Sequence, residues 1–316
     1  MRIAQIAILA KIYGNVNADA VIGQRVTLKR MYSTDGETYP FVSARAIKYA
    51  VREALRERGH EIDPFELSGK RVVDSGDPAK YTDNDIFGFM KAEKGVRELA
   101  SRRQAPIAIS YFKALRDTPI TTEIGLRTPR IEGKTPEMVE RESRALLPFE
   151  VEVAEFTGRI NCIIYDYVGR YQGTENIGKK KAVNSGEEIV KVPERRRRLQ
   201  DFLDIFLTPS YVLPRRTNSL NLPEYIAALV MLSEKGAGPI FQYLDYIREN
   251  GKTLVDVQKL ALLAGRKEIS GTKMLIDYQA AVPVDSPIPA TDLNSAIKSI
   301  TDFLVPEKDE ATQLPR

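Results

Sequence analysis

The chain has 316 residues, of which 43% are hydrophobic, so it can bury a sizeable core as one elaborated domain or as a domain with a large insertion. A single cysteine and a single histidine exclude disulfide frameworks and metal sites built from Cys and His clusters. The net charge of +4 suits an anionic partner but is too small to demonstrate one.

The apolar runs are too short to cross a membrane. The longest, at 225–232, falls well below the roughly 18 to 20 residues that a membrane span requires. The apolar N-terminus is interrupted by Lys11 and lacks a cleavage site, which favours a buried strand over a signal peptide. We therefore expect a cytoplasmic protein.

The first elements predicted are two strands joined by a polar loop. Residues 2–13 are rich in Ile and Ala and predict a strand, and the loop after it has the residue types of a turn. A second strand at 25–32 ends in a hairpin-like turn at Asp35-Gly36. The polar residues of interest in this region are Asn15, Asn17, Lys29 and Arg30.

A helix is predicted directly afterwards, over 44–58. Pro40 cannot lie inside it, Ser43 is a good N-cap, and Gly59 ends it. At 100° per residue the helix has an apolar face and a basic face. The apolar face holds Ile47, Ala50, Val51, Ala54 and Leu55, and the basic face holds Arg45, Lys48, Arg52 and Arg56.

The basic face has two interpretations. It is either a solvated surface or a surface that follows a nucleic-acid backbone, which Arg and Lys contact without reading the base sequence. On either interpretation we expect Lys48 and Arg52 to point away from the core.

Residues 60–135 resemble an insertion rather than a layer of the core, because glycine, proline and charges interrupt them. Within this stretch the motif FGFM contributes three large apolar side chains that either pack locally or contact a partner: Phe87, Phe89 and Met90. A strand is predicted within 101–117, entered through Arg102 and Arg103, and an exposed excursion within 118–136.

The second half alternates between strands and a helix. Residues 149–166 predict a long strand or a hairpin bent at Gly158, and 193–207 predict a helix whose four consecutive arginines, 195–198, attract nucleic acid or pair with nearby acids. A last apolar strand is expected at 225–232 and a largely helical segment at 238–304.

The order strand, helix, strand, strand, helix, strand predicts an α+β fold with a ferredoxin-like or RNA-recognition-type core. No nucleotide-binding or zinc-protease motif is present, Cys162 is expected in a buried strand, and His60 is expected in a loop. The expected parts are 1–59 and 136–235 for the core, 60–135 for the insertion, 236–304 for a helical C-terminal part, and 305–316 for a tail.

Several phrases occur in an order that resembles a known family. They are IAILAKIYGNVNAD, LKRMY, YPFVSARAIKYAVREAL, DIFGFM, RRQAPIAISYFKAL and TEIGLR. Their order, and above all the phrase VSARAIKYAVR, resembles the DevR (autoregulator) family of CRISPR-associated proteins. This is the backbone subunit of type I Cascade complexes, of the I-B kind, and the similarity covers roughly residues 1–165.

The resemblance implies a right-hand shape with an RNA-recognition-like palm and inserted fingers and thumb. It also implies copies that stack along a CRISPR guide RNA and present it for pairing with target DNA, with other Cascade subunits as partners, no cofactor and no catalysis. The matching positions implied to bind RNA are Asn15, Asn17, Lys29, Arg30, Ser43, Arg45, Lys48, Arg52, Arg102 and Arg103.

Two alternatives stay open. Related type III subunits resemble metal-dependent ribonucleases that use a loop aspartate, and Asp19 and Asp35 lie in predicted loops where a carboxylate and Mg²⁺ could act. The second alternative is that the chain is a regulator that binds no RNA. Arg215 and Arg216 lie in the half that matches the family least.

Overall fold

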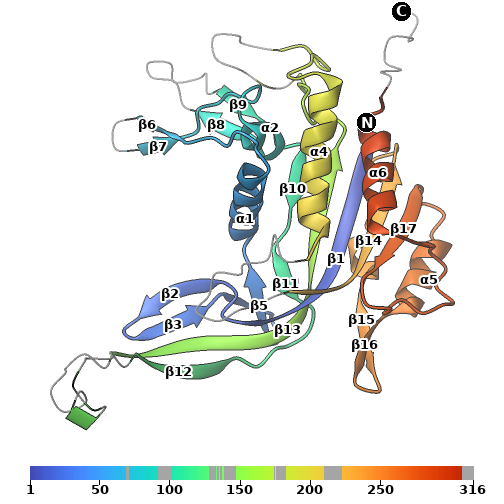
Figure 1. Cartoon of the computed structure of the whole chain (residues 1–316). Coiled ribbons are helices and arrows are strands. Elements are labelled where there is room, and N and C mark those ends of the chain that lie inside the picture. Colours follow the sequence, from blue (N-terminus) through green and yellow to red (C-terminus); the bar gives the residue numbers. More distant parts are fainter. Residues whose placement is uncertain are drawn as a thin grey trace, which may run out of the picture.

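We describe the protein from a computed structural model (Figure 1). The structure describes residues 1–68, 71–91, 101–127, 133, 135, 137–138, 147–173, 175, 183–209 and 223–307. Arg215 and Arg216 therefore lie outside the described residues. No helix among these residues is long and apolar enough to span a bilayer.

The first strand, β1 (Ile3–Gly14), lies in the middle of a large sheet. It pairs antiparallel with β13 (Leu147–Tyr165) on one side and with β14 (Glu224–Ser233) on the other. All three strands occur where the sequence predicts them, and β13 is one long strand rather than a hairpin. The nearly continuous apolar character of β1 and β14 follows from their central position, because both faces of the sheet are covered there, whereas β13 alternates apolar and polar residues along much of its length.

The sheet extends outwards from these three strands in the order β18-β17-β14-β1-β13-β11-β5-β4. The hairpin predicted at Asp35-Gly36 joins the two outermost strands at one end, and Gly36 has the positive φ of 84° that such turns favour. The bounds of the outer strands are β4 Arg30–Tyr32, β5 Thr38–Val42, β10 Ile107–Ile109, β11 Phe112–Ala114, β17 Thr272–Asp277 and β18 Ala290–Thr291.

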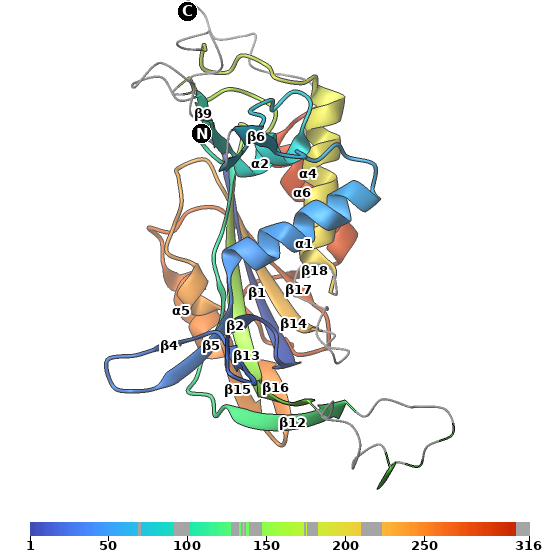
Figure 2. The same ribbon diagram turned by 90° about the vertical axis from the view of Figure 1, so that its left-hand side faces the viewer.

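Three helices cover one face of this sheet, and a fourth, α5 (Val257–Gly265), lies on the other (Figure 2). The even-numbered residues of β1 and β13 pack against α1 (Ala44–Glu57), α4 (Val192–Leu207) and α6 (Leu293–Leu304) in one core. Ala7 and Leu9 of β1 belong to a second core with α5. The structure confirms the helices predicted at 44–58 and 193–207.

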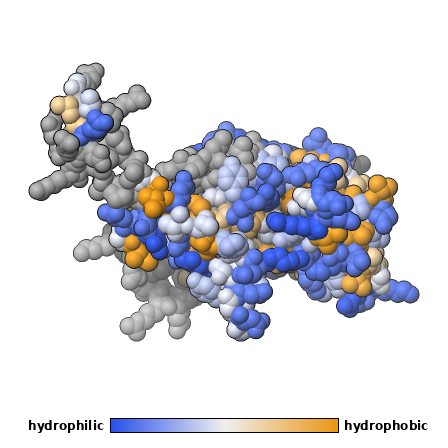
Figure 3. All heavy atoms as spheres, turned by 90° about the horizontal axis from the view of Figure 1, so that it is seen from below, coloured by the Kyte–Doolittle hydropathy of each residue, from blue (hydrophilic) through white to orange (hydrophobic). Residues whose placement is uncertain are grey.

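A flat arm projects from the bottom of the sheet in Figure 1. It consists of β2 (Ala18–Ile22), β3 (Arg25–Leu28), β12 (Thr121–Arg127) and the first half of β13, with β3 running parallel to β13. The view from below shows apolar side chains gathered on the arm among charged ones (Figure 3). Three of the exposed apolar residues there are Val21, Ile22 and Ile124.

Within the stretch predicted as an insertion, 60–135, the part up to Arg103 folds as short elements near the C-terminal end of α1 (Figure 1). They are β6 (Glu66–Ser68), β7 (Arg71–Val73), α2 (Thr82–Phe87), β8 (Phe89–Lys91) and β9 (Ser101–Arg103). The prediction that this stretch is no layer of the core is wrong for β10 and β11, which pair with β13 in the main sheet. The strand predicted within 101–117 is divided into β9, which pairs with β8, and into β10 and β11, which pair with β13 before and after Ser110 and Tyr111.

The prediction that residues 236–304 are largely helical is wrong. Besides α5 and α6, this part contains β17, β18 and a hairpin of β15 (Tyr246–Glu249) and β16 (Lys252–Val255), preceded by a short 3-10 turn, Phe241–Tyr243. The hairpin forms at Asn250-Gly251, where φ is 50° and 77°. Two successive positive φ angles define the type I′ turn that Asn-Gly favours, so this turn overrides the apparent helical spacing.

Candidate nucleic-acid interface

Helix α1 begins at a junction that brings several predicted residues together. Ser43 is its N-cap, and its side-chain oxygen accepts a hydrogen bond from the Ala46 N–H at 3.3 Å. The Ser43 N–H in turn donates to Asn17 Oδ1 at 2.9 Å, and the Asn17 carbonyl accepts from the Lys29 N–H at 3.0 Å. The loop after β1 is therefore bound to the start of the helix.

Asn15 is buried at this junction, with 8% of its surface exposed. Its side-chain amide donates to the Glu152 carbonyl at 2.8 Å. A buried amide with this partner holds the loop against β13 rather than meeting a ligand. Of the two predicted loop asparagines, only Asn17 is partly exposed.

The two cations of the following strand are engaged in ion pairs. The Lys29 ammonium lies 2.7 Å from Asp19 Oδ1, and one Arg30 nitrogen lies 2.8 and 3.0 Å from the two oxygens of Glu152. Each side chain remains 27% exposed. Lys29 and Arg30 therefore keep some access to solvent while their charges are already compensated.

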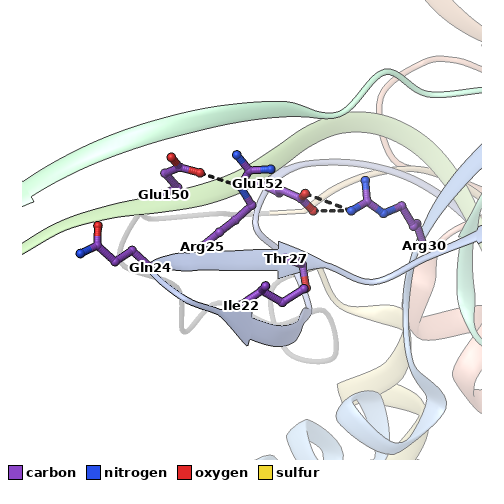
Figure 4. A pocket seen from close by; sticks show the side chains of 7 residues that line it. All are labelled: Ile22, Gln24, Arg25, Thr27, Arg30, Glu150 and Glu152. Atoms are coloured by element: carbon purple, nitrogen blue, oxygen red, sulfur yellow. Dashed lines mark hydrogen bonds and ion pairs between the residues drawn. The ribbon is translucent and has the colours of Figure 1, made fainter.

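Arg30 and Glu152 line a pocket of about 470 Å³ between the β2–β3 hairpin and β13 (Figure 4). Arg25 lies across the pocket and pairs with Glu150 at 2.6 Å. With two arginines facing two glutamates, this pocket is polar and close to neutral. Its lining residues are Ile22, Gln24, Arg25, Thr27, Arg30, Glu150 and Glu152.

Arg45 differs from these cations. It is exposed in the first turn of α1, and it has no hydrogen bond or ion pair within the described part of the chain. No acidic residue occupies this turn. The first backbone N–H groups of a helix also carry partial positive charge, so the free guanidinium and the helix start favour an anion together.

Lys48 and Arg52 do not point away from the packed interior, so that expectation is wrong. Both cations lie over the ring of Phe87, at 4.9 and 5.2 Å from its centre, and Arg52 Nε is 2.8 Å from Asp83 Oδ2. The cause is α2, which covers this side of α1. Burial, and secondarily the charge of Arg52, lowers the pKa of Lys48.

Arg102 and Arg103, the two predicted RNA-binding arginines before β10, differ in exposure. Arg102 is exposed on β9. The Arg103 guanidinium is fully buried and lies 2.6 Å from Asp85 and 3.1 Å from Glu175. This geometry contradicts the prediction that Arg103 meets RNA, because no surface of its cation is accessible.

The aromatic candidates of the FGFM motif are also mostly interior. Phe87 and Phe89 are each 7% exposed, and the Phe87 ring packs edge-on against Phe202 of α4 at 6.4 Å. Only Met90 is exposed, at 72%. Local packing therefore explains the two phenylalanines, and Met90 remains the one accessible candidate of the three.

The arginines of α4 are structural. Arg195 and Arg198 are buried, with Arg198 bound to Asp85, Glu194 and two backbone carbonyls. Arg196 pairs with Asp302 at 2.6 Å, and Arg197 lies between Glu194 and Asp201. The alternative interpretation from the sequence, pairing with nearby acids, is correct here.

The remaining chemical candidates are also internal or paired. Cys162 is buried in β13 as predicted, and burial raises the pKa of its thiol. His60 is a buried loop residue whose two nitrogens contact Thr82 and Asp201 at 3.0 and 2.8 Å. Asp19 pairs with Lys29, and the described residues contain no cluster of three or more His, Cys, Asp or Glu arranged for a metal.

One accessible aromatic residue near Arg45 was not predicted from the sequence. Tyr49 is 56% exposed and lies one helical turn after Arg45. Because residues four apart share a helix face, its ring lies on the same side as the free guanidinium. The i, i+4 spacing of Arg45 and Tyr49 in the sequence could have predicted this pair, but the basic residues of α1 were the only ones considered as ligand contacts.

Three comparisons bear on this arrangement. The family model described as "CRISPR-associated negative auto-regulator DevR/Csa2" matches residues 70–210. No curated protein matches the sequence.

Among solved structures, a chain from a "CRISPR RNA-guided surveillance complex" aligns with a TM-score of 0.58 at 15% identity, covering 95% of this chain and all of that one. A chain from a complex described as "pre-nicking" gives 0.57 at 12% identity, covering 94% of this chain and 99% of that one. At such identities the likeness concerns the fold. Together, the family match and the shared α+β fold confirm the resemblance of this chain to the DevR/Csa2 family of CRISPR-associated proteins.

Proposed function

We propose that this protein is a backbone subunit of a type I Cascade effector complex that binds the CRISPR guide RNA without reading its sequence. Copies would lie side by side along the guide and present it to target DNA, together with other subunits of the complex. The family match and the near-complete overlap with chains of surveillance complexes support this proposal.

The strand order fits an RNA-recognition-type palm. The strands β14-β1-β13-β10 are adjacent and antiparallel, and in sequence order they alternate with α1 and α4 as strand, helix, strand, strand, helix, strand. This order and connectivity match those of a ferredoxin-like sheet and support the proposal of an RNA-recognition-type palm. In this proposal the arm of β2, β3 and β12 and the segment around α2 are the thumb and fingers.

The observation that carries the proposal is the uncompensated Arg45 at the start of α1. It is joined through Ser43 and Asn17 to the loop after β1, and Tyr49 lies beside it. A guanidinium and a helix start attract a phosphate, and an exposed ring can stack on a base. The protein thus acts by holding a strand, without catalysis.

Expression in cells that also carry a repeat array tests this directly. The wild-type protein should purify with small RNA as a large assembly that ribonuclease disperses. Arg45→Glu should lose most of this RNA and keep its melting temperature, because Arg45 has no described partner to lose. Lys267→Glu is the matched control, since Lys267 is an exposed cation beyond α5.

Two results would contradict the proposal. Wild-type protein free of RNA would favour a regulator, and Arg45→Glu retaining as much RNA as Lys267→Glu would exclude the α1 site. Incubation of the assembly with complementary RNA and Mg²⁺ tests the non-catalytic part. Regularly spaced cuts that disappear in Asp19→Ala or Asp35→Ala would indicate a ribonuclease.

A further inference from the structure

Lys48 on α1 is a partly exposed amine that has no acidic partner among the described residues. Within this part of the chain it forms no hydrogen bond and no ion pair, because the carboxylate on this side of α1, that of Asp83, is bound by Arg52 Nε at 2.8 Å. Lys48 Nζ is not one of the fully buried polar atoms that lack a hydrogen bond, so it keeps contact with solvent. The observations that carry the proposed function do not include this amine.

The surroundings of Lys48 favour the neutral form of the amine. Its Nζ lies 4.9 Å from the centre of the Phe87 ring, and the Arg52 guanidinium lies 5.2 Å from the same ring. A ring face weakly favours an ammonium group. Burial, however, and secondarily the charge of Arg52, lowers the pKa of Lys48. A lysine that is desolvated beside an apolar group and a second cation is an activated nucleophile.

The other polar groups near this amine carry no free negative charge. The Cys162 thiol of β13 lies within electrostatic reach of Lys48, and burial raises the pKa of this thiol, so it stays protonated at neutral pH. The Asp83 carboxylate accepts from the Asp63 N–H at 2.9 Å as well as from Arg52. The described residues thus leave the charge of a Lys48 ammonium uncompensated.

Arg45 provides an anion-binding group beside the amine. It precedes Lys48 by three positions, and residues three apart on a helix are neighbours, with about 5–6 Å between their Cβ atoms. Arg45 is exposed and has no ion pair within the described part of the protein. A small electrophile whose leaving group is anionic therefore fits the pair of side chains, since the guanidinium binds the leaving group next to the nucleophile.

We propose that Lys48 is a site of covalent acylation by acyl phosphates. The neutral amine attacks the carbonyl carbon, and a C–N bond forms as the C–O bond to phosphate breaks. The departing phosphate keeps the electron pair of that bond and takes up the proton that the amine loses. Arg45 pairs with the phosphoryl oxygens and positions the electrophile. The products are an uncharged amide at Lys48 and free phosphate.

Acetyl phosphate is the probe that tests this site. The full-length protein is treated with ribonuclease, incubated with acetyl phosphate and digested, and mass spectrometry measures the acetylation rate at each lysine. Lys48 should react several-fold faster than Lys267, an exposed lysine beyond α5. Unfolding in guanidinium chloride should remove this preference, because folding brings Phe87 to the amine. A folded protein in which Lys48 reacts no faster than Lys267 would overturn the proposal.

The pH dependence of the same reaction reports on the amine itself. Because the pKa of Lys48 is lowered, its acetylation rate should level off at a lower pH than the rate of a lysine in a short peptide. A Lys48 profile that coincides with the peptide profile would show that the amine is not activated, and the proposal would then be wrong.

Arg45→Gln tests the positioning role of the guanidinium. The variant should acetylate Lys48 about 2- to 5-fold more slowly with acetyl phosphate, the range for one exposed ion pair, and Lys267 at the wild-type rate. With N-hydroxysuccinimidyl acetate, whose leaving group carries no phosphate, Lys48 should react equally in both proteins. Equal rates with acetyl phosphate as well would refute the assignment to acyl phosphates.

The inference stands independently of the proposed guide binding, because the reaction is measured on protein freed of RNA. A guide held at Arg45 should shield Lys48, so RNA-loaded protein should react more slowly than free protein. Equally fast reaction in both would count against the α1 site for RNA and support the acylation site. Reaction of Lys48 at the Lys267 rate in the free protein would reject acylation alone.

Discussion

The two arginine-rich helices α1 and α4 resemble each other in sequence and differ in the structure. In α4 the four consecutive arginines all have partners, and two of them are buried. In α1 the arginine of the first turn, Arg45, is exposed and uncompensated. Density of positive charge alone therefore does not indicate where an anion binds.

The difference arises from what surrounds each helix. Helix α4 lies between α1 and α6, and the α2 segment supplies Asp85 at its buried side. A buried arginine is tolerated only when acceptors surround it, and here carboxylates and backbone carbonyls do so. Arg45, in the first turn of α1, has no such acceptor among the described residues, so its charge is available to an external partner.

The largest effect is expected at the centre of the α4 network. Asp85→Ala leaves the buried Arg103 and Arg198 without their shared carboxylate, which should lower the free energy of unfolding by about 3–5 kcal/mol. Urea denaturation measures this loss. Arg197→Ala, on the same helix but 46% exposed, should change stability by less than about 1 kcal/mol. Equal losses in both variants would refute the distinction between buried and exposed arginines.

A smaller loss of stability is expected on the covered side of α1. The Arg52→Glu substitution places a second carboxylate beside Asp83, whose side chain is only 3% exposed. It also removes a cation from the face of the Phe87 ring. We expect about 1–3 kcal/mol, because Arg52 itself retains 24% exposure. Thermal melting of Arg52→Glu, compared with that of Arg56→Glu at a more exposed position on α1, measures this loss of stability. An unaltered melting temperature would show that α2 does not depend on this contact.

The exposed end of α1 should affect binding and not folding. Arg45→Ala is expected to weaken RNA binding by roughly tenfold or less at moderate salt, and to reduce the slope of log affinity against log salt by about one. Titrations at several salt concentrations measure both quantities. A slope equal to that of wild type would mean that Arg45 contacts no phosphate.

The smallest effect concerns His60, which links the end of α1 to α4. Burial lowers its pKa below the usual 6.5, so the unfolded chain binds a proton more readily than the folded protein. Stability should therefore fall as the pH drops below about 6.5, where the unfolded-state histidine becomes charged. Melting curves between pH 5 and 8 should show a steeper decline for wild type than for His60→Gln. Parallel curves would assign the acid sensitivity to other groups.

Local patterns predicted the regular elements well. Ser43 and Gly59 bound α1, an alternating β-branched pattern marked β13, and a continuous apolar run marked β14, because caps and strand burial leave their signal within a few residues. The C-terminal part was misassigned although Asn250-Gly251 is a strong hairpin signal, since apolar residues on either side also fit a helical period. The relation between Arg45 and Tyr49 was likewise present in the sequence.

By itself the sequence determined where α1 begins, that β1, β13 and β14 are buried strands, and which family the chain resembles, because each depends on neighbouring residues or on a linear order of motifs. Only the tertiary structure decided which cations are free. Arg52 meets Asp83 and Arg103 meets Glu175 across 31 and 72 positions of the chain. The charge that a side chain presents depends on partners brought to it by folding, and no local pattern records such partners.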